Sequence, residues 1–331
     1  MKLLNTTFTP IAVGACLLLG AGPSLADSLA DNYPSSAITL VVPFAPGGGV
    51  DIVGRILAKS LTAELGKSVV VENKPGASGM IGAGAVAQSN PDGLTLLLAS
   101  SGEVAINPHL YKSMTYSPEK DLAPITLIAK IPNLLTVDPR LPINNVSELV
   151  AYAKAHPNKL SYSSSGVGNI QNITGELLNS MAGTHILHVP YKGSAPAIAD
   201  VAGGQVSMTF ASGAASLPFI SSGKIRPIGV TSSKPMKAFP DVPPIKASPE
   251  LKDFELDNWF GFFTKAGTPE AIIKKLNAAT VKALSDPDVV KALETQGAEP
   301  APMTPQEFAD FRNQQSRLFS DIIEKAHITV N

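Results

Sequence analysis

Residues 42–51 have the sequence VPFAPGGGVD, in which a strand-like apolar run ends in a glycine turn. After the turn, apolar residues recur every four positions from Val53 to Leu65, which predicts a helix that starts at the glycines and ends at Gly66. The free N–H groups at a helix start carry about half a positive charge, and glycines allow close approach to them. This loop is therefore suited to an anion, although an ordinary tight turn explains the same residues.

Short apolar, β-branched runs alternate with helical stretches along most of the 331 residues. This alternation predicts an α/β fold with largely parallel sheets, and the length is sufficient for two domains with cores of their own. The expected strands lie at 38–44, 68–72, 94–100, 125–129, 134–137, 160–163, 186–189, 206–210, 225–230 and 259–264.

Prolines and capping residues mark further boundaries. Two proline-rich stretches, 131–141 and 231–249, are the expected crossings between the halves, because no long flexible linker is visible. Near the C-terminus, a capping residue followed by proline predicts the start of three helices, at 268–269, 286–287 and 304–305.

The start of the chain has the pattern of a secretory signal. Lys2, the apolar run 11–20 and the small residues Ser24 and Ala26 on either side of Leu25 predict a signal peptide of residues 1–26. Cys16 is the only cysteine, so the remaining chain has no disulfide and no thiol nucleophile, which suits an oxidising compartment. A lipoprotein site at Cys16 is the alternative, but the apolar run continues past it. We expect an exported, periplasmic protein.

A second loop, SSSGVGN at 163–169, also follows a strand and precedes a helix. Its hydroxyl and amide groups can donate hydrogen bonds to a carboxylate without adding charge. Two small polar turns, 76–79 and 100–102, follow other strands, and open α/β sheets bind ligands at the carboxyl ends of their strands. Anion-binding loops in both halves of the chain imply a cleft between them.

Other functional classes have weak support in the sequence. The net charge of −1 does not favour a nucleic acid partner. GAGAVA at 82–87 matches a dinucleotide fingerprint only formally, because it lies inside a helical stretch, so no cofactor is expected. His185 and His188 face opposite sides of an expected strand, which does not favour a shared metal. A serine hydrolase is the alternative, but the loops offer no general base.

Several motifs support a family resemblance over nearly the whole length after residue 26: YP at 33–34, PFAPGG at 43–48, ENKPGASG at 72–79, SSGVG at 164–168, HVPYKGSAP at 188–196, GGQV at 203–206 and GTP at 267–269. In these motifs the chain resembles the Bug (Bordetella uptake gene) family, the substrate-binding proteins of tripartite tricarboxylate transporters.

The resemblance implies a two-lobed periplasmic-binding-protein architecture of type II, the Venus flytrap, in which each lobe is a mostly parallel sheet flanked by helices. Residues 27–130 and 250–331 would form lobe 1, and residues 131–249 lobe 2. The implied function is capture of a small organic carboxylate without catalysis, by a monomer that serves membrane transporter subunits or a sensor kinase. The identity of the acid stays open, because Phe44 can cover an alkyl chain or an aromatic ring.

The resemblance also assigns the site and shows departures from the family pattern. Asn169 and Asn172 replace residues more usual in relatives, and Ala211 stands where many relatives have aspartate. We expect an acid to bind better than its amino-acid analogue, because Ala211 cannot pair with an ammonium group. The expected ligand-binding residues are Phe44, Ala45, Gly47, Gly48, Gly49, Asp51, Ala77, Ser78, Ser100, Ser101, Ser164, Ser165, Gly166, Gly168, Asn169, Asn172, Ala211 and Ser212.

Overall fold

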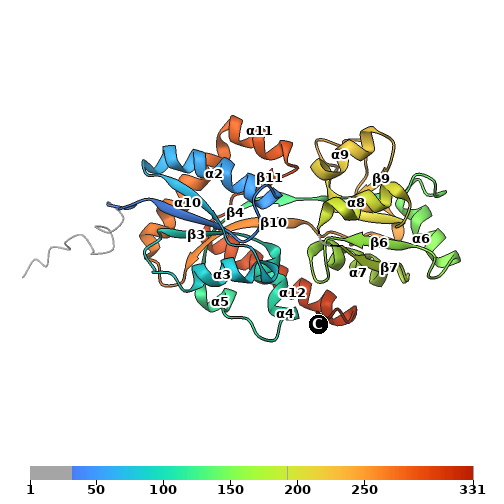
Figure 1. Ribbon diagram of the computed structural model, residues 1–331, viewed down its shortest axis with the longest axis horizontal. Helices are drawn as coiled ribbons and strands as arrows, with labels where there is room; N and C mark the ends of the chain where they lie inside the picture. Colours follow the sequence, from blue (N-terminus) through green and yellow to red (C-terminus); the bar gives the residue numbers. More distant parts are fainter. Residues whose placement is uncertain (1–31, 192, 331) are drawn as a thin grey trace, which may run out of the picture.

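The computed structural model describes residues 32–191 and 193–330. The expected signal peptide, residues 1–26 with Cys16, lies outside the described residues. Two sheets, each flanked by helices, form two bodies that are joined by extended segments (Figure 1). The predicted two-lobed α/β architecture is confirmed.

The first sheet has six strands in the order β11-β4-β10-β3-β1-β2. Its strands are β1 (Ile38–Val42), β2 (Val69–Asn73), β3 (Thr95–Ser100), β4 (Leu122–Ile131), β10 (Asn258–Lys265) and β11 (Glu299–Pro300). The second sheet has five strands in the order β7-β6-β8-β5-β9. Its strands are β5 (Asn133–Val137), β6 (Ser161–Ser164), β7 (Leu187–Pro190), β8 (Met208–Ser212) and β9 (Arg226–Val230).

Both sheets are mixed, which differs from the expected mostly parallel pairing. In the first sheet β1 runs parallel to β2 and β3, whereas β10 is antiparallel to β3 and β4. In the second sheet β6 runs parallel to β7 and β8, whereas β5 is antiparallel to β8 and β9. The antiparallel strands β4, β5 and β10 adjoin the crossings, where the chain leaves one sheet and returns from the other.

Helices cover both faces of the sheets. Around the first sheet they are α2 (Gly49–Leu65), α3 (Met80–Ala87), α4 (Asn107–Leu110), α5 (Pro118–Asp121), α10 (Glu270–Ser285), α11 (Pro287–Thr295) and α12 (Pro305–Lys325), with the short turns η1 (Ala77–Gly79) and η2 (Gly102–Ile106). Around the second sheet they are α6 (Val146–Ala155), α7 (Ile170–Ala182), α8 (Ser194–Gly203) and α9 (Gly213–Ser221), with η3 (Ile245–Ala247) and η4 (Pro249–Leu251).

Strand alternation divides the first lobe into two cores. Leu40 of β1 packs toward α2 and Leu57, while the next residue, Val41, packs on the opposite face with Phe263 and Phe308. Both faces of this sheet are therefore covered, which explains why its strands are apolar at successive positions.

The glycines of the GAGAVA segment have a packing role, as expected. They lie in α3, and a Cβ at Gly82 would come within 2.8 Å of the Pro43 Cα. Only glycine lets α3 approach the end of β1 this closely, so the segment supports the loop at 42–51.

Thr231 ties the two crossings together. Its backbone N–H donates to the Asn133 carbonyl at 2.9 Å, and its hydroxyl oxygen accepts from the Asn133 N–H and donates to the Asp257 carboxylate, each at 2.9 Å. The first crossing consists of Pro132 between β4 and β5, and the second extends from Thr231 to Asp257. Both lie where the proline-rich stretches predicted them, while the expected lobe boundaries stay a prediction.

Candidate ligand-binding site

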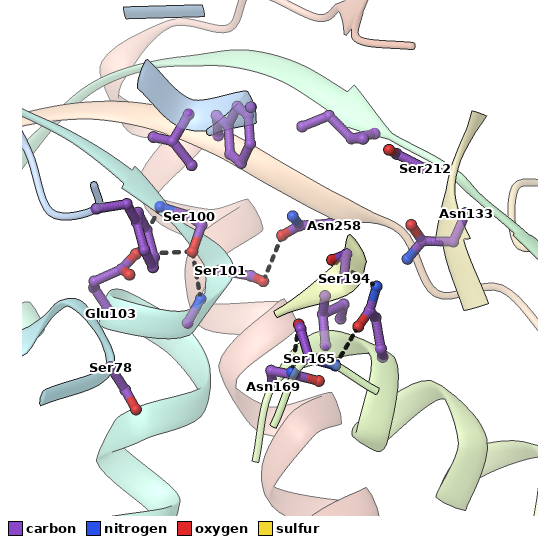
Figure 2. A pocket seen from close by; sticks show the side chains of 18 of the residues that line it. Ser78, Ser100, Ser101, Glu103, Asn133, Ser165, Asn169, Ser194, Ser212 and Asn258 are labelled. Atoms are coloured by element: carbon purple, nitrogen blue, oxygen red, sulfur yellow. Dashed lines mark hydrogen bonds between the residues drawn. The ribbon is translucent and has the colours of Figure 1, made fainter. Parts of the chain in front are cut away.

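A cavity of about 430 Å³ lies where the carboxyl ends of strands from both sheets face each other (Figure 2). This volume is in the range of small-molecule sites. The structure brings these predicted residues together in its wall: Phe44, Gly49, Ser78, Ser100, Ser101, Ser165, Gly166, Gly168, Asn169 and Ser212.

The start of α2 forms the first clamp of the cavity. Gly48 is its N-cap and provides no side-chain hydrogen bond, while Gly49 and Val50 line the cavity. A Cβ at Gly49 would meet no atom within 4 Å, so the approach to the first turn of α2 is open. The first N–H groups of α2 are therefore available to an anion.

Asp51 lies in the first clamp but does not line the cavity, contrary to expectation. Its side chain is buried, and its carboxylate accepts hydrogen bonds from the Gly47 N–H at 2.9 Å, from Arg55 Nε at 3.0 Å and from Asn73 Nδ2 at 2.9 Å. The hydrogen bond from Arg55 is the main cause that lowers the pKa of Asp51 to about 2. Asp51 thus fixes the turn and joins α2 to β2.

The second clamp is the loop between β6 and α7, and it uses its own amides internally. The Ser165 N–H donates to Gln171 Oε1 at 2.7 Å, and the Gly168 N–H donates to Asn172 Oδ1 at 3.0 Å. These amides were expected to hold the carboxylate. The Ser165 hydroxyl stays available to a ligand, because it accepts from Asn169 Nδ2 at 2.7 Å and keeps its own proton to donate (Figure 2).

A serine–histidine pair lies behind the second clamp. Ser164 Oγ is 2.6 Å from His188 Nε2, and the Nδ2 of Asn172 donates to His188 Nδ1 at 3.3 Å. Burial lowers the pKa of His188 to about 4, so the ring is neutral, and the bond from Asn172 places its proton on Nε2. Nε2 therefore donates to Ser164 and cannot accept its proton. The network stabilises the loop and does not activate a nucleophile.

Ser164 and Asn172 therefore do not line the cavity, and Ala211 does not either. Ser164 and Ala211 are fully buried, and Asn172 is 2% exposed. Ala211 lies in the core between β8 and α8 with Ile198, because successive residues of a strand face opposite sides. Its neighbour Ser212 faces the cavity, so residue 211 gives no information about an ammonium group in the ligand.

The turn at 76–79 supplies one serine to the wall. Ala77 and Ser78 have φ values of 47° and 51°, which are unusual for residues with a side chain. Asn107 Nδ2 donates to the Ser78 carbonyl at 2.9 Å and holds the turn in place. Ser78 lines the cavity, whereas Ala77 is exposed outside it, as are Ala45, Gly47 and Gly48.

Glu103 is the one ionisable side chain among the described residues that line the cavity. It is fully buried, and its Oε2 accepts from the N–H of Ser100 at 2.7 Å and from the hydroxyl of Ser100 at 2.9 Å (Figure 2). Its Oε1 has no hydrogen-bond partner among the described residues. Burial raises the pKa of Glu103 to about 7.

Other cavity residues were missing from the sequence-based site. Asn133 and Asn258 directly follow the two crossings. The positions of the crossings could be predicted, although the direction of these side chains could not. The full set of additional lining residues is Val50, Val53, Gly102, Glu103, Asn107, Ile131, Asn133, Val167, Ile170, Gln171, Ser194, Asn258, Phe260, Gln296 and Ala298.

Helix starts contribute positive potential to the cavity. Besides α2, the starts of α7, α8 and α9 contribute Ile170, Ser194 and Ser212 to the wall. No lysine, arginine or histidine lines the cavity in the described part of the chain. The partial positive charge at helix N-termini favours an anion, and hydroxyl and amide groups offer donors to it.

The described residues lack a metal-binding cluster and a membrane-spanning helix. Within 32–191 and 193–330, no cluster of three or more His, Cys, Asp or Glu residues could hold a metal ion. Among the helices of the same ranges, none is both long and apolar enough to span a bilayer.

Comparisons with a family model, with a curated relative and with two solved structures agree. A model of the family described as "Tripartite tricarboxylate transporter family receptor" matches residues 53–328. BugT of Bordetella pertussis is 35% identical over 297 residues, which cover 89% of this chain and 91% of BugT. The structure of R. palustris Rpa4515 with adipate is 35% identical, with a TM-score of 0.80 over 90% of this chain and 99% of that chain. MatC from Rhodopseudomonas palustris with bound malate is 31% identical, with a TM-score of 0.75 over 88% of this chain and all of that chain, 100%.

Proposed function

The chain belongs to the tripartite tricarboxylate transporter receptor family, and on this basis we propose that it is a periplasmic solute-binding protein for a small organic carboxylate. The observation that carries the proposal is the cavity between the two sheets, whose wall combines helix N-termini and hydroxyl groups with no basic side chain among the described residues. Such a wall favours an anion whose charge is met by dipoles and hydrogen bonds.

Each sheet is the core of one lobe. Lobe 1 consists of residues 27–130 and 250–331, and lobe 2 consists of residues 131–249. The open start of α2 holds one face of the acid, and Ser165 with Ser194 holds the other. A micromolar Kd corresponds to a binding free energy of about −8 kcal/mol. Because each helix end contributes only about 0.3 to 2 kcal/mol, several hydrogen bonds must act together to reach this value. Capture of the acid therefore depends on both lobes.

The acid is proposed to leave the cavity unchanged. The Ser164–His188 pair is the best candidate for a nucleophile and base. However, the Ser164 hydroxyl donates to the Gly166 carbonyl and His188 Nε2 donates to Ser164, so the histidine cannot take up the serine proton. Relatives with adipate and malate in their sites support linear di-acids and hydroxy acids as the class to test first. We propose further that a monomer delivers the acid to membrane transporter subunits, with a sensor kinase as the alternative partner.

A thermal-shift screen tests the proposed function. Succinate, malate, glutarate and adipate are compared with their diamides, which keep the shape of the acid and lose its charge. At 100 times its Kd, a bound acid stabilises the protein by about 2.7 kcal/mol, which raises Tm by several degrees. We expect at least one acid to raise Tm while its diamide does not. Equal shifts with acid and diamide, or none with any acid, would contradict the proposal.

A further inference from the structure

Both crossings place an asparagine in the cavity wall. Asn133 is the first residue of β5 and Asn258 is the first residue of β10, and each directly adjoins a crossing between the sheets. Asn258 pairs with Ile131 across β10 and β4, and Asn133 pairs with Ser212 across β5 and β8. All four residues line the cavity, so its hinge side is a continuous surface.

The amide group of Asn258 has a fixed orientation. Its Oδ1 accepts from the Ser101 hydroxyl and from the Trp259 N–H, each at 2.9 Å (Figure 2). Both of these side-chain hydrogen bonds use Oδ1, so the two N–H groups of Nδ2 are left as donors for a ligand.

Asn133 supplies the second set of donors. The residue is 4% exposed, and its Nδ2 is buried without a hydrogen-bond partner in the described ranges. Its backbone N–H and carbonyl are both hydrogen-bonded to Thr231, which fixes the position of its Cα beside the crossing. Figure 2 shows its amide turned toward the side where Asn258 and Ser194 lie. A buried N–H group without a partner is costly, which points to a partner supplied by the ligand.

The donor groups on this surface favour a ligand group that accepts hydrogen bonds. Four amide N–H groups and the Ser212 hydroxyl can donate, and no acidic side chain belongs to this hinge side of the wall. An ammonium group or a methyl group would leave these amide N–H groups without partners. A carboxylate has two oxygens that can accept from both asparagines at once.

We propose that Asn133 and Asn258, with Ser212 beside them, form a hinge subsite that binds the second carboxylate of a di-acid. The inference rests on the proposed function, because the clamps at α2 and Ser165 must hold the first carboxylate. The subsite makes the protein discriminate a di-acid from a mono-acid of equal chain length. It also links the bound acid to the two segments that connect the lobes.

Calorimetric titration of matched acid pairs tests the subsite: succinate against butyrate, glutarate against valerate and adipate against hexanoate. The variants are Asn133→Leu and Asn258→Leu, which keep the approximate shape of asparagine and remove its donors, with Asn90→Leu on the exposed surface as the matched control. We expect each cavity variant to weaken the di-acid by about tenfold or more and the mono-acid by less than about threefold. The control should behave as the wild type.

Asn133→Asp and Asn258→Asp replace the leucine variants if those do not fold, since aspartate keeps the size of the side chain and cannot donate when ionised. They should give the same selective loss of the di-acid. If wild type prefers di-acids and the variants keep that preference, or lose both ligands equally, the subsite is wrong and the proposed function stands. If wild type binds no acid of either series, the proposed function fails and the subsite fails with it.

Discussion

At the scale of single residues, Glu103 couples the cavity to pH. Its folded pKa of about 7 lies above the value of 4.5 for an ordinary glutamate, because burial disfavours the ionised form more than the bonds from Ser100 favour it. Between these two values the folded protein keeps a proton that the unfolded chain releases. The contribution of Glu103 to stability is therefore present below about pH 4.5 and is lost as the pH rises to about 7.

Glu103→Gln removes this titration and keeps the size of the side chain. The free energy of unfolding of both proteins is measured by urea unfolding from pH 4.5 to 7. Over this range we expect the value for wild type minus the value for the variant to fall by roughly 3 kcal/mol at most. His188, whose pKa is lowered to about 4, and Asp257, whose pKa burial raises to about 6, are present in both proteins and cancel in the difference. A difference that does not change with pH, or that grows in favour of wild type, would contradict the account.

Residues of the site could be predicted from the sequence only where they follow an expected strand or lie at the start of an expected helix. Phe44, Ser101, Ser165 and Asn169 were found because they lie in loops with that pattern. Asn133 and Asn258 gave no such signal, since a strand residue faces the cavity or the core according to a register that only the pairing of both sheets decides.

At the scale of elements, the start of α2 is the part of the site most open to a ligand. Gly49 has space beyond its Cα and an ordinary backbone conformation, so valine can be accommodated without strain in the fold. The added side chain would occupy the approach to the free N–H groups of α2.

Gly49→Val should therefore weaken acid binding by about tenfold or more in a calorimetric titration, with far-UV circular dichroism unchanged. Gly203→Val is the control, because Gly203 ends α8 and also has no atom within 4 Å of an added Cβ. Affinity within about twofold of wild type for Gly49→Val would show that α2 does not contact the acid.

The elements themselves could be predicted well from local pattern. Each of the ten expected strands overlaps a strand of the structure, and α11 and α12 begin at the expected proline motifs, with the capping box of Thr304 and Glu307 present. α10 begins one residue later than expected, with Pro269 as its N-cap in place of Thr268 and no side-chain cap. β11 was missed because it is two residues long and one of them is proline. The antiparallel pairings were also missed, since periodicity does not carry strand direction.

At the scale of the whole molecule, the lobes meet at the crossings and also at α12. Ile173 of α7 lies in one apolar cluster with Phe319 and Ile322 of α12 (Figure 1). A Cβ at Gly168 would come within 2.6 Å of Leu110 and 3.2 Å of Val330. The second clamp thus packs against the first lobe. The cavity is therefore closed at the crossings by Asn133 and Asn258, and residues of both lobes line its wall.

The most direct test is the crystal structure of the protein with the acid that gives the largest thermal shift. We expect electron density for one acid in the cavity, with its first carboxylate within hydrogen-bonding distance of the start of α2 and of Ser165. Density on only one lobe, or outside the wall formed by these residues, would contradict the claim that both lobes hold the acid.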